Sequence, residues 1–398
     1  MVQVASLFNQ LLQHFPRTEF AALVRKHGAE RRAKGFSCWT QFVAMLFCQL
    51  SHTDSLREIC NGLSCCLGKL IHLGVQRAPQ RSTLSYANQH RPAALFEDLF
   101  WTMLGRFREQ QGLGPRPTRF RFKNKLLLLD STTISLCLSL FPWAGFKRAK
   151  GGVKAHVLLD HDDYMPRFLL LTTAKTSDVR AARSVPLPRQ SIVVCDRAYL
   201  NFSTFAQWDA QGVFFVCRSP HPPLYRVLRR QTVNSSSILN DQIVQYTGRY
   251  SGRYGYPLRR ITVRVSGEDP LVLITNHMQF AASTIARIYK ERWQIEVFFK
   301  TLKQNLKIKT FVGTTENALR IQIWTALIAM LLLKWLHHLS KARWSLSNLA
   351  SMLRLNLFTY RDLDQWIDNP FGTLPLQPQP EQLLLDLPGF GHPIQISG

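Results

Sequence analysis

Tyr289–Lys303 reads YKERWQIEVFFKTLK, and its charged and phenolic residues have the spacing Y-x2-R-x3-E-x6-K. The four residues in this pattern are Tyr289, Arg292, Glu296 and Lys303. No proline or glycine interrupts residues 283–306, so we predict one helix. At about 3.6 residues per turn, the four side chains fall close to one face. That face fits either an exposed helix with an Arg292–Glu296 ion pair or a carboxylate held beside phosphates.

Charge and composition limit the classes of protein to which this chain can belong. It has 398 residues, of which 46% are hydrophobic, so it is long enough for two or three folded domains. Lys and Arg number 50 against 25 Asp and Glu, and the net charge of +25 is spread along the chain. A protein this basic is expected to meet polyanions, with DNA or RNA as the leading partner. An anionic membrane surface is the weaker alternative, because no basic amphipathic anchor stands out.

The sequence predicts neither export nor membrane insertion. Met1–Pro16 lacks the basic start and continuous apolar core of a signal peptide. The longest apolar stretch, Ile321–Leu333, has 13 residues, which is too short to span a bilayer and predicts a buried helix. The eight cysteines form no C-x2-C pair, as is typical of reduced cysteines in a cytosolic protein. An irregularly spaced zinc site is a minor alternative, with Cys60, Cys65 and Cys66 joined by His52 or His72.

Residues 1 to about 112 are predicted to be helical, and one of their segments has the composition of a nucleic-acid contact. Trp39–Leu50 is nearly all apolar and indicates a buried helix. Arg81–Arg91 reads RSTLSYANQHR and predicts a short helix with Ser82 as its N-cap. This helix either contacts DNA bases and phosphates or is a solvated helix of a bundle. Its polar side chains are Arg81, Ser85, Asn88, Gln89 and Arg91, of which Arg81, Asn88 and Arg91 are the predicted DNA contacts.

The middle of the chain is predicted to form a mixed α/β structure. Gln111–Thr118 contains two glycines and two prolines and reads as a basic linker, which either follows a DNA backbone or only adds solubility. The predicted strands are Leu126–Leu129, Ile134–Leu140, Val153–Leu159, Phe168–Thr173, Ser191–Cys195, Val213–Cys217 and Leu271–Thr275. Helices between the later strands indicate a mixed sheet covered by helices. Ser219–Pro270 has few helical signals and predicts a β-rich insertion.

Two of the apolar strands are each followed by an acid. LLLLDST contains Asp130 and IVVCDRAY contains Asp196, and such positions put carboxylates at the rim of a sheet. Each acid alone has a structural alternative, a strand-end cap for Asp130 and an ion pair with Arg197 for Asp196. Together with Glu296 they form an all-oxygen set that suits Mg²⁺ or Mn²⁺. Two such ions would clamp the attacking and leaving oxygens of a phosphodiester displacement.

These motifs, in this order and spacing, resemble those of the DDE transposases of bacterial insertion sequences. The similarity is to the fourth insertion-sequence family, which is defined by the tyrosine–arginine–glutamate–lysine signature. The segments SLREI, RSTLSYAN and FPWAGFKRAKGGVKAH are also similar to that family, and the last of them contains Lys154 and His156. The resemblance covers most of residues 1–345, and the C-terminal segment matches least.

The resemblance implies a fold and a set of roles. The fold would be a ribonuclease H-like α/β core with a β-rich insertion, preceded by an all-α N-terminal domain. Asp130, Asp196 and Glu296 would be catalytic and would bind two Mg²⁺ or Mn²⁺ ions. The residues that would hold DNA are Tyr289, Arg292, Lys303, Lys154 and His156, beside the N-terminal set. The reaction would be cleavage at the ends of the element and transfer to target DNA.

The resemblance also implies how the chain divides into domains, which partners it binds and where in the cell it acts. The expected parts are a DNA-binding domain at 1–112, a core at 113–218 and 271–342, an insertion at 219–270 and a tail at 343–398. The partners would be double-stranded DNA, at the element ends and at the target, and a second copy of the chain once bound to DNA. The expected location is the bacterial cytoplasm, at the nucleoid. A nuclease without strand transfer and a non-catalytic DNA-binding relative are the two alternatives.

One departure from the family concerns an aromatic side chain. In members that form a DNA hairpin, a tryptophan of the β-rich insertion stacks on a flipped base, whereas this chain has no tryptophan between Trp208 and Trp293. Tyrosine could stack instead, because any aromatic face can serve. The tyrosines available are Tyr246, Tyr250, Tyr254 and Tyr256. The hairpin step is therefore left open.

Overall fold

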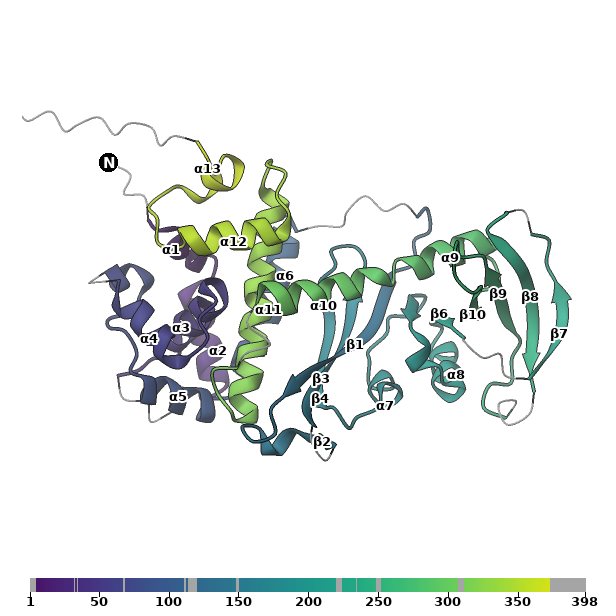
Figure 1. Ribbon diagram of the computed structural model, residues 1–398, viewed down its shortest axis with the longest axis horizontal. Helices are drawn as coiled ribbons and strands as arrows, with labels where there is room; N and C mark the ends of the chain where they lie inside the picture. Colours follow the sequence, from purple (N-terminus) through teal and green to yellow (C-terminus); the bar gives the residue numbers. More distant parts are fainter. Residues whose placement is uncertain are drawn as a thin grey trace, which may run out of the picture.

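One mixed sheet of ten strands runs through the middle of the molecule, with a group of helices at one end (Figure 1). The computed structural model describes residues 5–31, 33, 35–66, 69–110, 112–113, 120–147, 150–219, 224–233, 235–247, 252–306 and 311–372. The strands pair in the order β2-β3-β1-β5-β6-β10-β9-β8-β7, and β4 pairs with β3. Their bounds are β1 Leu126–Leu136, β2 Gly145–Lys147, β3 Lys150–Asp160, β4 Pro166–Thr173, β5 Ile192–Cys195, β6 Phe214–Arg218, β7 Tyr225–Arg230, β8 Ile238–Tyr246, β9 Leu258–Val263 and β10 Leu271–Thr275.

The helices precede, cover and follow this sheet. Before the sheet come α1 Leu7–Gln13, α2 Arg17–Lys26, α3 Cys38–Ser51, α4 Leu56–Ser64, the 3-10 helix η1 Lys69–Leu73, α5 Arg81–His90 and α6 Ala94–Gln110. Between the strands lie η2 Pro142–Ala144, α7 Asp178–Ala182, η3 Arg197–Tyr199 and α8 Phe202–Ala210. After the last strand come α9 Ala282–Lys290, α10 Trp293–Asn305, α11 Glu316–Leu339, α12 Leu346–Asn356 and α13 Leu363–Asp368. The prediction of a mixed sheet covered by helices is confirmed.

Most predicted strands are present, but the first two are wrong in one respect. Leu126–Leu129 and Ile134–Leu140 were expected as separate strands, whereas β1 runs unbroken through Leu136. The reason is β3, which pairs with β1 residue by residue from Leu127 to Leu136 and so keeps the polar residues between them extended. The predicted β-rich insertion contains β7, β8 and β9, and β9 pairs with β10, so these strands extend the same sheet. Most of the predicted linker lies outside the described residues.

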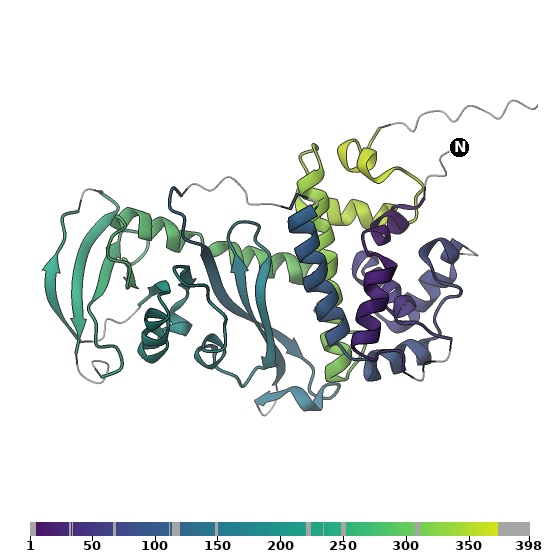
Figure 2. The same ribbon diagram turned by 180° about the vertical axis from the view of Figure 1, so that it is seen from behind.

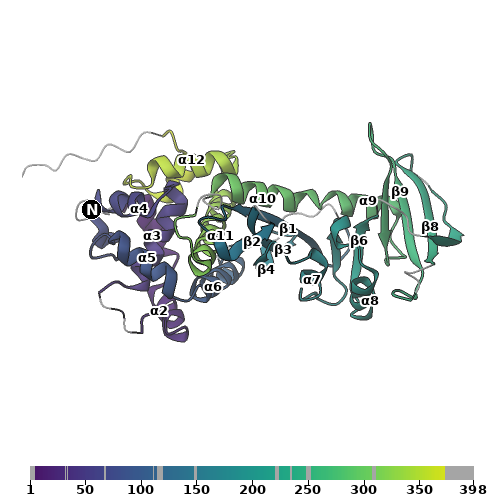
Figure 3. The same ribbon diagram turned by 60° about the horizontal axis from the view of Figure 1, so that its bottom comes forward.

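Helices cover the two faces of the sheet, and the side chains of each strand alternate between two cores. In β1, Leu126 and Leu128 join the core beneath α9 and α10, whereas Leu127 and Leu129 join the core beneath α8. Figure 3 shows α9 and α10 on one side of the sheet and α7 and α8 on the other. In β1, even-numbered residues therefore face α9 and α10, and odd-numbered residues face α8.

Helix α11 is the long buried helix that the sequence predicts. It has 24 residues and is apolar enough by length and composition to cross a membrane, but 89% of its 18-residue apolar window is buried inside the molecule. Seen from behind in Figure 2, α6 lies along α11 between the other N-terminal helices and the sheet. The segment after α11 also packs against the N-terminal helices, since Phe358 contacts Phe8 and the Thr359 carbonyl accepts from the Leu7 amide.

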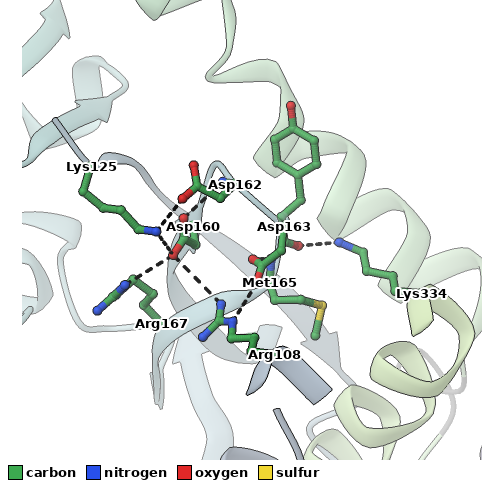
Figure 4. A network of polar contacts seen from close by, with 9 residues as sticks. Arg108, Lys125, Asp160, Asp162, Asp163, Met165, Arg167 and Lys334 are labelled. Carbon is green, nitrogen blue, oxygen red and sulfur yellow. Dashed lines mark hydrogen bonds and ion pairs between the residues drawn. The ribbon is translucent and has the colours of Figure 1, made fainter. Parts of the chain in front are cut away.

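A cluster of charged residues at the β3–β4 turn ties α6 and the start of β1 to the sheet (Figure 4). Asp160, at the end of β3, is 2% exposed and lies 3.1 Å from Lys125 and 3.3 Å from Arg167. The Arg108 guanidinium of α6 donates to Asp163 at 2.6 Å. Lys334 of α11 donates to a backbone carbonyl of the same turn. Buried acids are tolerated here because every one of them has a cationic partner.

Candidate active site

Asp130 and Asp196 lie beside each other because two parallel strands are in register. β5 pairs with the first part of β1, and the last pair joins Leu129 to Cys195. The residues that follow that pair are Asp130 and Asp196. Asp196 ends its strand as predicted and caps η3, where its carboxylate accepts from the Ala198 amide. Asp130 was expected at a strand end and instead lies in the middle of β1, since β1 continues where β5 stops.

The sequence predicts one helix for the signature residues, whereas the structure has two helices there. α9 ends at Lys290 and α10 begins at Trp293, so Tyr289 belongs to the first, Arg292 to the joint, and Glu296 and Lys303 to the second. The joint is tighter than an α-helix, since the Arg292 amide donates to the Tyr289 carbonyl three residues earlier. Ile288 and Ile295 on either side of the joint are buried against the sheet. This packing holds Glu296 on the same face of the sheet as Asp130.

Arg292 connects two of the three acids. Its guanidinium lies 2.6 Å from the Glu296 carboxylate and 3.7 Å from that of Asp130. The Arg292–Glu296 ion pair expected of an exposed helix therefore forms, but its arginine side chain is only 17% exposed and also reaches the strand acid. The ring of Tyr289 packs under this arginine, with the guanidinium carbon 5.8 Å from the ring centroid. Burial raises the pKa of Tyr289 to about 12, so its hydroxyl stays protonated.

Burial and neighbouring carboxylates both disfavour the charged form of Asp130. Burial raises its pKa from 3.8 to about 6, and the nearby Asp196 and Glu296 carboxylates also raise it. The Ser131 amide, which donates to Asp130 at 2.7 Å, and the Arg292 guanidinium act in the opposite direction. Asp130 is thus close enough to Asp196 and Glu296 for both carboxylates to disfavour its charged form, and a divalent cation would relieve that repulsion.

Lys154 and His156 face an acid inside the fold. Both are on β3 and face α7, where they surround Asp178 rather than solvent. The Lys154 ammonium lies 3.2 Å from Asp178, and the imidazole of His156, which is 0% exposed, lies 3.5 Å from it. We therefore withdraw these two residues from the predicted DNA contacts. Nothing in the sequence marks Asp178 except its position at the start of a short helix.

Asp178 supports Asp130 from the opposite face of β1. Its carboxylate accepts from the Ser131 hydroxyl at 2.5 Å, and the Ser131 amide is the donor to Asp130. Burial opposes ionisation of Asp178, but its contacts with His156, Ser131 and Lys154 outweigh burial and lower its pKa to about 2. Asp178 is thus charged at all ordinary pH values, and it fixes the residue that orients Asp130.

The predicted DNA contacts of the N-terminal region divide between surface and interior. Arg81 is exposed at the start of α5. Asn88 is 1% exposed and accepts from the Gln41 amide at 2.8 Å, so it packs α5 against α3 and does not face DNA. Arg91 donates to Gln41 at 3.2 Å and to the Phe36 carbonyl, and it too is an internal anchor. Ser82 is not the N-cap, because the helix starts at Arg81 after Gln80.

Only one of the proposed stacking tyrosines is exposed in the described part of the chain. Tyr246 and Tyr254 are 2% and 1% exposed and belong to the core beneath α8. Tyr256 is 70% exposed, and Tyr250 lies outside the described residues. A further exposed aromatic side chain, which the sequence patterns did not single out, stands close in sequence to Glu296. Trp293, the first residue of α10, is 60% exposed and stands three positions before Glu296.

The three acids offer oxygen donors only, which is the donor set that Mg²⁺ and Mn²⁺ prefer. Among the described residues, no three His, Cys, Asp or Glu side chains form a ready-made metal cluster, at these acids or at the cysteines considered for zinc. At the acids the reason is visible, since Arg292 occupies the space between Asp130 and Glu296 with its own positive charge. The chemistry of the donor set therefore fits a divalent cation, provided that Arg292 moves aside when the ion binds.

Half-buried carboxylates at two adjacent strands and a neighbouring helix, on a basic chain, are typical of phosphodiester-processing enzymes. The Transposase DDE domain family matches residues 121–332, and this chain belongs to it: it is a DDE transposase, an enzyme that acts on DNA. Residues 3–76 match a Domain of unknown function (DUF4372).

Two similar proteins are also named as transposases. The "Putative transposase y4zB" of Sinorhizobium fredii is 30% identical over 72% of this chain and 80% of its own length. The "Probable transposase for insertion sequence element IS5377" of Geobacillus stearothermophilus is 32% identical over 58% of this chain and 62% of its own. A solved piggyBac transposase in a synaptic complex with hairpin DNA aligns with 88% of this chain and 80% of its own at 10% identity, with a TM-score of 0.41.

The raised pKa of Asp130 predicts how the stability of the metal-free protein depends on pH. Because the folded state binds the Asp130 proton more tightly, this group stabilises the fold below about pH 4 and loses that contribution as pH rises through about 6. The difference between 3.8 and about 6 corresponds to about 3 kcal/mol as an upper bound. Asp130→Asn should therefore raise the melting temperature of metal-free protein at pH 8 and leave it unchanged at pH 4.

The matched control is Asp269→Asn, which neutralises an exposed acid in the β9–β10 turn. Its melting temperature should equal that of the wild type at both pH values. Equal melting temperatures of Asp130→Asn and wild type at pH 8 would show that the charged form of Asp130 does not destabilise the fold.

Proposed function

We propose that this transposase binds the ends of an insertion sequence, cleaves them and joins them to target DNA, using Asp130, Asp196 and Glu296 as its catalytic acids. The observation that supports the proposal is geometric: the parallel register of β1 and β5 places Asp130 beside Asp196, and Arg292 reaches both Asp130 and Glu296. DDE transposases in general use divalent metal ions, and we propose two Mg²⁺ or Mn²⁺ ions per site. Such ions would lower the pKa of bound water and neutralise the charge that develops on the scissile phosphate.

We also propose the finer classification that the signature suggests. The chain would belong to the fourth insertion-sequence family, with a ribonuclease H-like core at 113–218 and 271–342. The helical segment at 1–112 would bind DNA, and the strands of 219–270 would form the insertion. Support comes from β1, β3, β4, β5 and β6, which form the expected mixed half-sheet with Asp130 and Asp196 on neighbouring strands.

The chain's own residues would have distinct tasks. Asp130, Asp196 and Glu296 supply the negative charge that holds the cations. Arg292, now paired with two of these acids, is the group that would exchange carboxylate partners for phosphate. Lys303, whose ammonium lies 3.3 Å from the Thr133 carbonyl on the same side of β1, would hold a phosphate further along α10. Tyr289 would mainly support the Arg292 guanidinium with its ring.

The test uses the full chain, Mg²⁺ and a labelled duplex that carries one terminal inverted repeat of the element beside its gene. We expect cleavage at the repeat boundary that requires the metal, followed by joining of the new 3′-hydroxyl to a plasmid. Cleavage without joining would instead indicate a nuclease, and binding without cleavage would indicate a non-catalytic relative. A doubling of bound mass when both ends are present would support assembly as a homodimer on DNA.

The exposed side chain of Trp293 leads to a prediction about how the DNA end is cleaved. An exposed indole three positions before Glu296 is suited to stack on a base that leaves its pair near the cleavage point. Trp293→Ala should weaken cleavage of a fully paired end roughly 5- to 150-fold, the equivalent of about 1–3 kcal/mol per stacked base. Trp293→Phe, which keeps an aromatic face, should recover most of the activity. Equal losses in both variants would contradict stacking and point to a packing role.

A further inference from the structure

Helix α5 presents a polar face to solvent that has no function within the fold. Its side chains Leu84, Ala87 and Asn88 point inward and are buried. The residues on the opposite face are all exposed, and they are Arg81, Ser82, Ser85, Tyr86, Gln89 and His90. Within the described part of the chain, the side chains of Arg81, Ser82, Ser85 and Gln89 make no hydrogen bond or ion pair. Their hydrogen-bonding groups are therefore available to a partner.

The orientation of this face is fixed from behind by the buried amides of Gln41 and Asn88 and the half-buried amide of Asn317. Asn88 bonds to Gln41 of α3, as described above. Asn317 of α11 donates to the backbone carbonyls of Asn88 at 2.9 Å and Arg91 at 2.7 Å. Buried amide networks that are fully bonded hold elements in one arrangement more strictly than apolar packing does. Because α11 also packs against α10, the face of α5 has a set position relative to the acids.

The chemistry of the face suits a duplex DNA partner. Between Glu58 and Glu97 the sequence contains no Asp or Glu, while Lys69, Arg77, Arg81 and Arg91 lie in that interval. A helix that only faces solvent in a bundle commonly mixes acids with its bases, whereas a helix that approaches phosphates must avoid acids. The face also carries a glutamine, two serines and an arginine, which are side chains that hydrogen-bond to base edges in the major groove. Tyr86 is 65% exposed and stacks on His90 with ring centroids 4.0 Å apart, which stiffens the end of the face.

We propose that the outward face of α5 reads the base sequence of the element's end in the major groove, with Ser85 and Gln89 at its centre. This proposal rests on the proposed function, since it assigns the sequence recognition that the catalytic acids lack. Asn88 and Arg91, which were predicted as DNA contacts, make hydrogen bonds inside the fold. The proposal assigns base contact to the exposed Ser85 and Gln89 instead. Arg81, the first residue of α5, remains one of the proposed DNA contacts.

The test is selection from a pool of duplexes with a randomised core, using the full chain at fixed salt. We expect the wild type to enrich one sequence. Ser85→Ala and Gln89→Ala should each lose the preference at one or two neighbouring base pairs of that sequence. Their affinity for the enriched duplex should fall roughly 5- to 150-fold, while affinity for the unselected pool changes less than about twofold. The matched controls are Ser203→Ala and Gln207→Ala on the exposed side of α8, which should enrich the wild-type sequence.

The outcomes separate this proposal from the one on which it rests. If the wild type enriches a sequence and both α5 variants enrich the same one, base reading by α5 is wrong and the proposed function stands. If the variants lose the same affinity for selected and unselected DNA, α5 contacts only phosphates and the proposal is overturned. If the wild type enriches nothing but cleaves its own ends, recognition resides in the DNA junction and not in this helix. Circular dichroism melts of each variant verify that the surface changes leave the fold intact.

Discussion

Glu296→Gln should abolish metal-dependent cleavage of the element's end while leaving binding to that end in place. Glutamine keeps an oxygen that can accept from Arg292, now 2.6 Å from the carboxylate, so α10 should stay folded and oriented. What is lost is the negative charge that would hold a divalent cation beside Asp130 and Asp196. Removing a group that acts through the transition state costs roughly three orders of magnitude or more in rate. The measurement is single-turnover cleavage under saturating protein, with binding measured separately in Ca²⁺ by gel shift.

Glu291→Gln is the matched control for this variant. Glu291 has the same charge and lies at the joint between α9 and α10, but its carboxylate lies 3.3 Å from His161 and not beside the acids. Its cleavage rate should stay within about threefold of the wild type. Full cleavage by Glu296→Gln, or equal losses in the two variants, would remove Glu296 from the catalytic set.

The sequence predicts that Asp130 and Asp196 follow apolar strands, which is a local pattern, but it does not predict side-chain directions that depend on strand pairing. Asp130 and Asp196 each follow a run of apolar residues, and the parallel register of β1 and β5 then brings them together. The spacing of residues within β3 cannot say that Lys154 and His156 point at Asp178, because that follows from the alternation of faces and from where α7 packs.

The helices show the same limit. The composition of Arg81–Arg91 correctly indicates a polar helix, but the direction of its faces is set by Gln41 and Asn317, which are distant in sequence. Propensity likewise predicts one helix over residues 283–306, since neither Glu291 nor Arg292 is a helix breaker. The joint forms because the helix must follow the sheet on both sides of it, which is a tertiary requirement that a local pattern does not carry.

The second large effect concerns stability, at a buried ion pair that anchors the signature helices. Arg259 of β9 donates to both carboxylate oxygens of Asp241 of β8, at 2.8 and 2.6 Å, and each side chain is 3% exposed. The same guanidinium donates to the Phe280 carbonyl, just before α9 begins. Arg259→Ala would leave the buried Asp241 carboxylate without its cationic partner and would remove the donor to the half-buried Phe280 carbonyl. We expect it to lower the free energy of unfolding by about 3–5 kcal/mol, measured by urea titration with circular dichroism.

Two comparisons decide whether burial or charge alone accounts for that loss. Arg320→Ala removes an arginine that also pairs with an acid at 2.7 Å, but the two side chains are 39% and 54% exposed, so the loss should stay below about 1 kcal/mol. The double variant Arg259→Met with Asp241→Leu removes both charges together and should recover much of the stability, because no uncompensated charge remains in the core. It would not restore the bond to Phe280, however. If the double variant is stable yet cleaves DNA poorly, Arg259 serves chiefly to hold the start of α9, and through α9 the joint that presents Arg292 and Glu296.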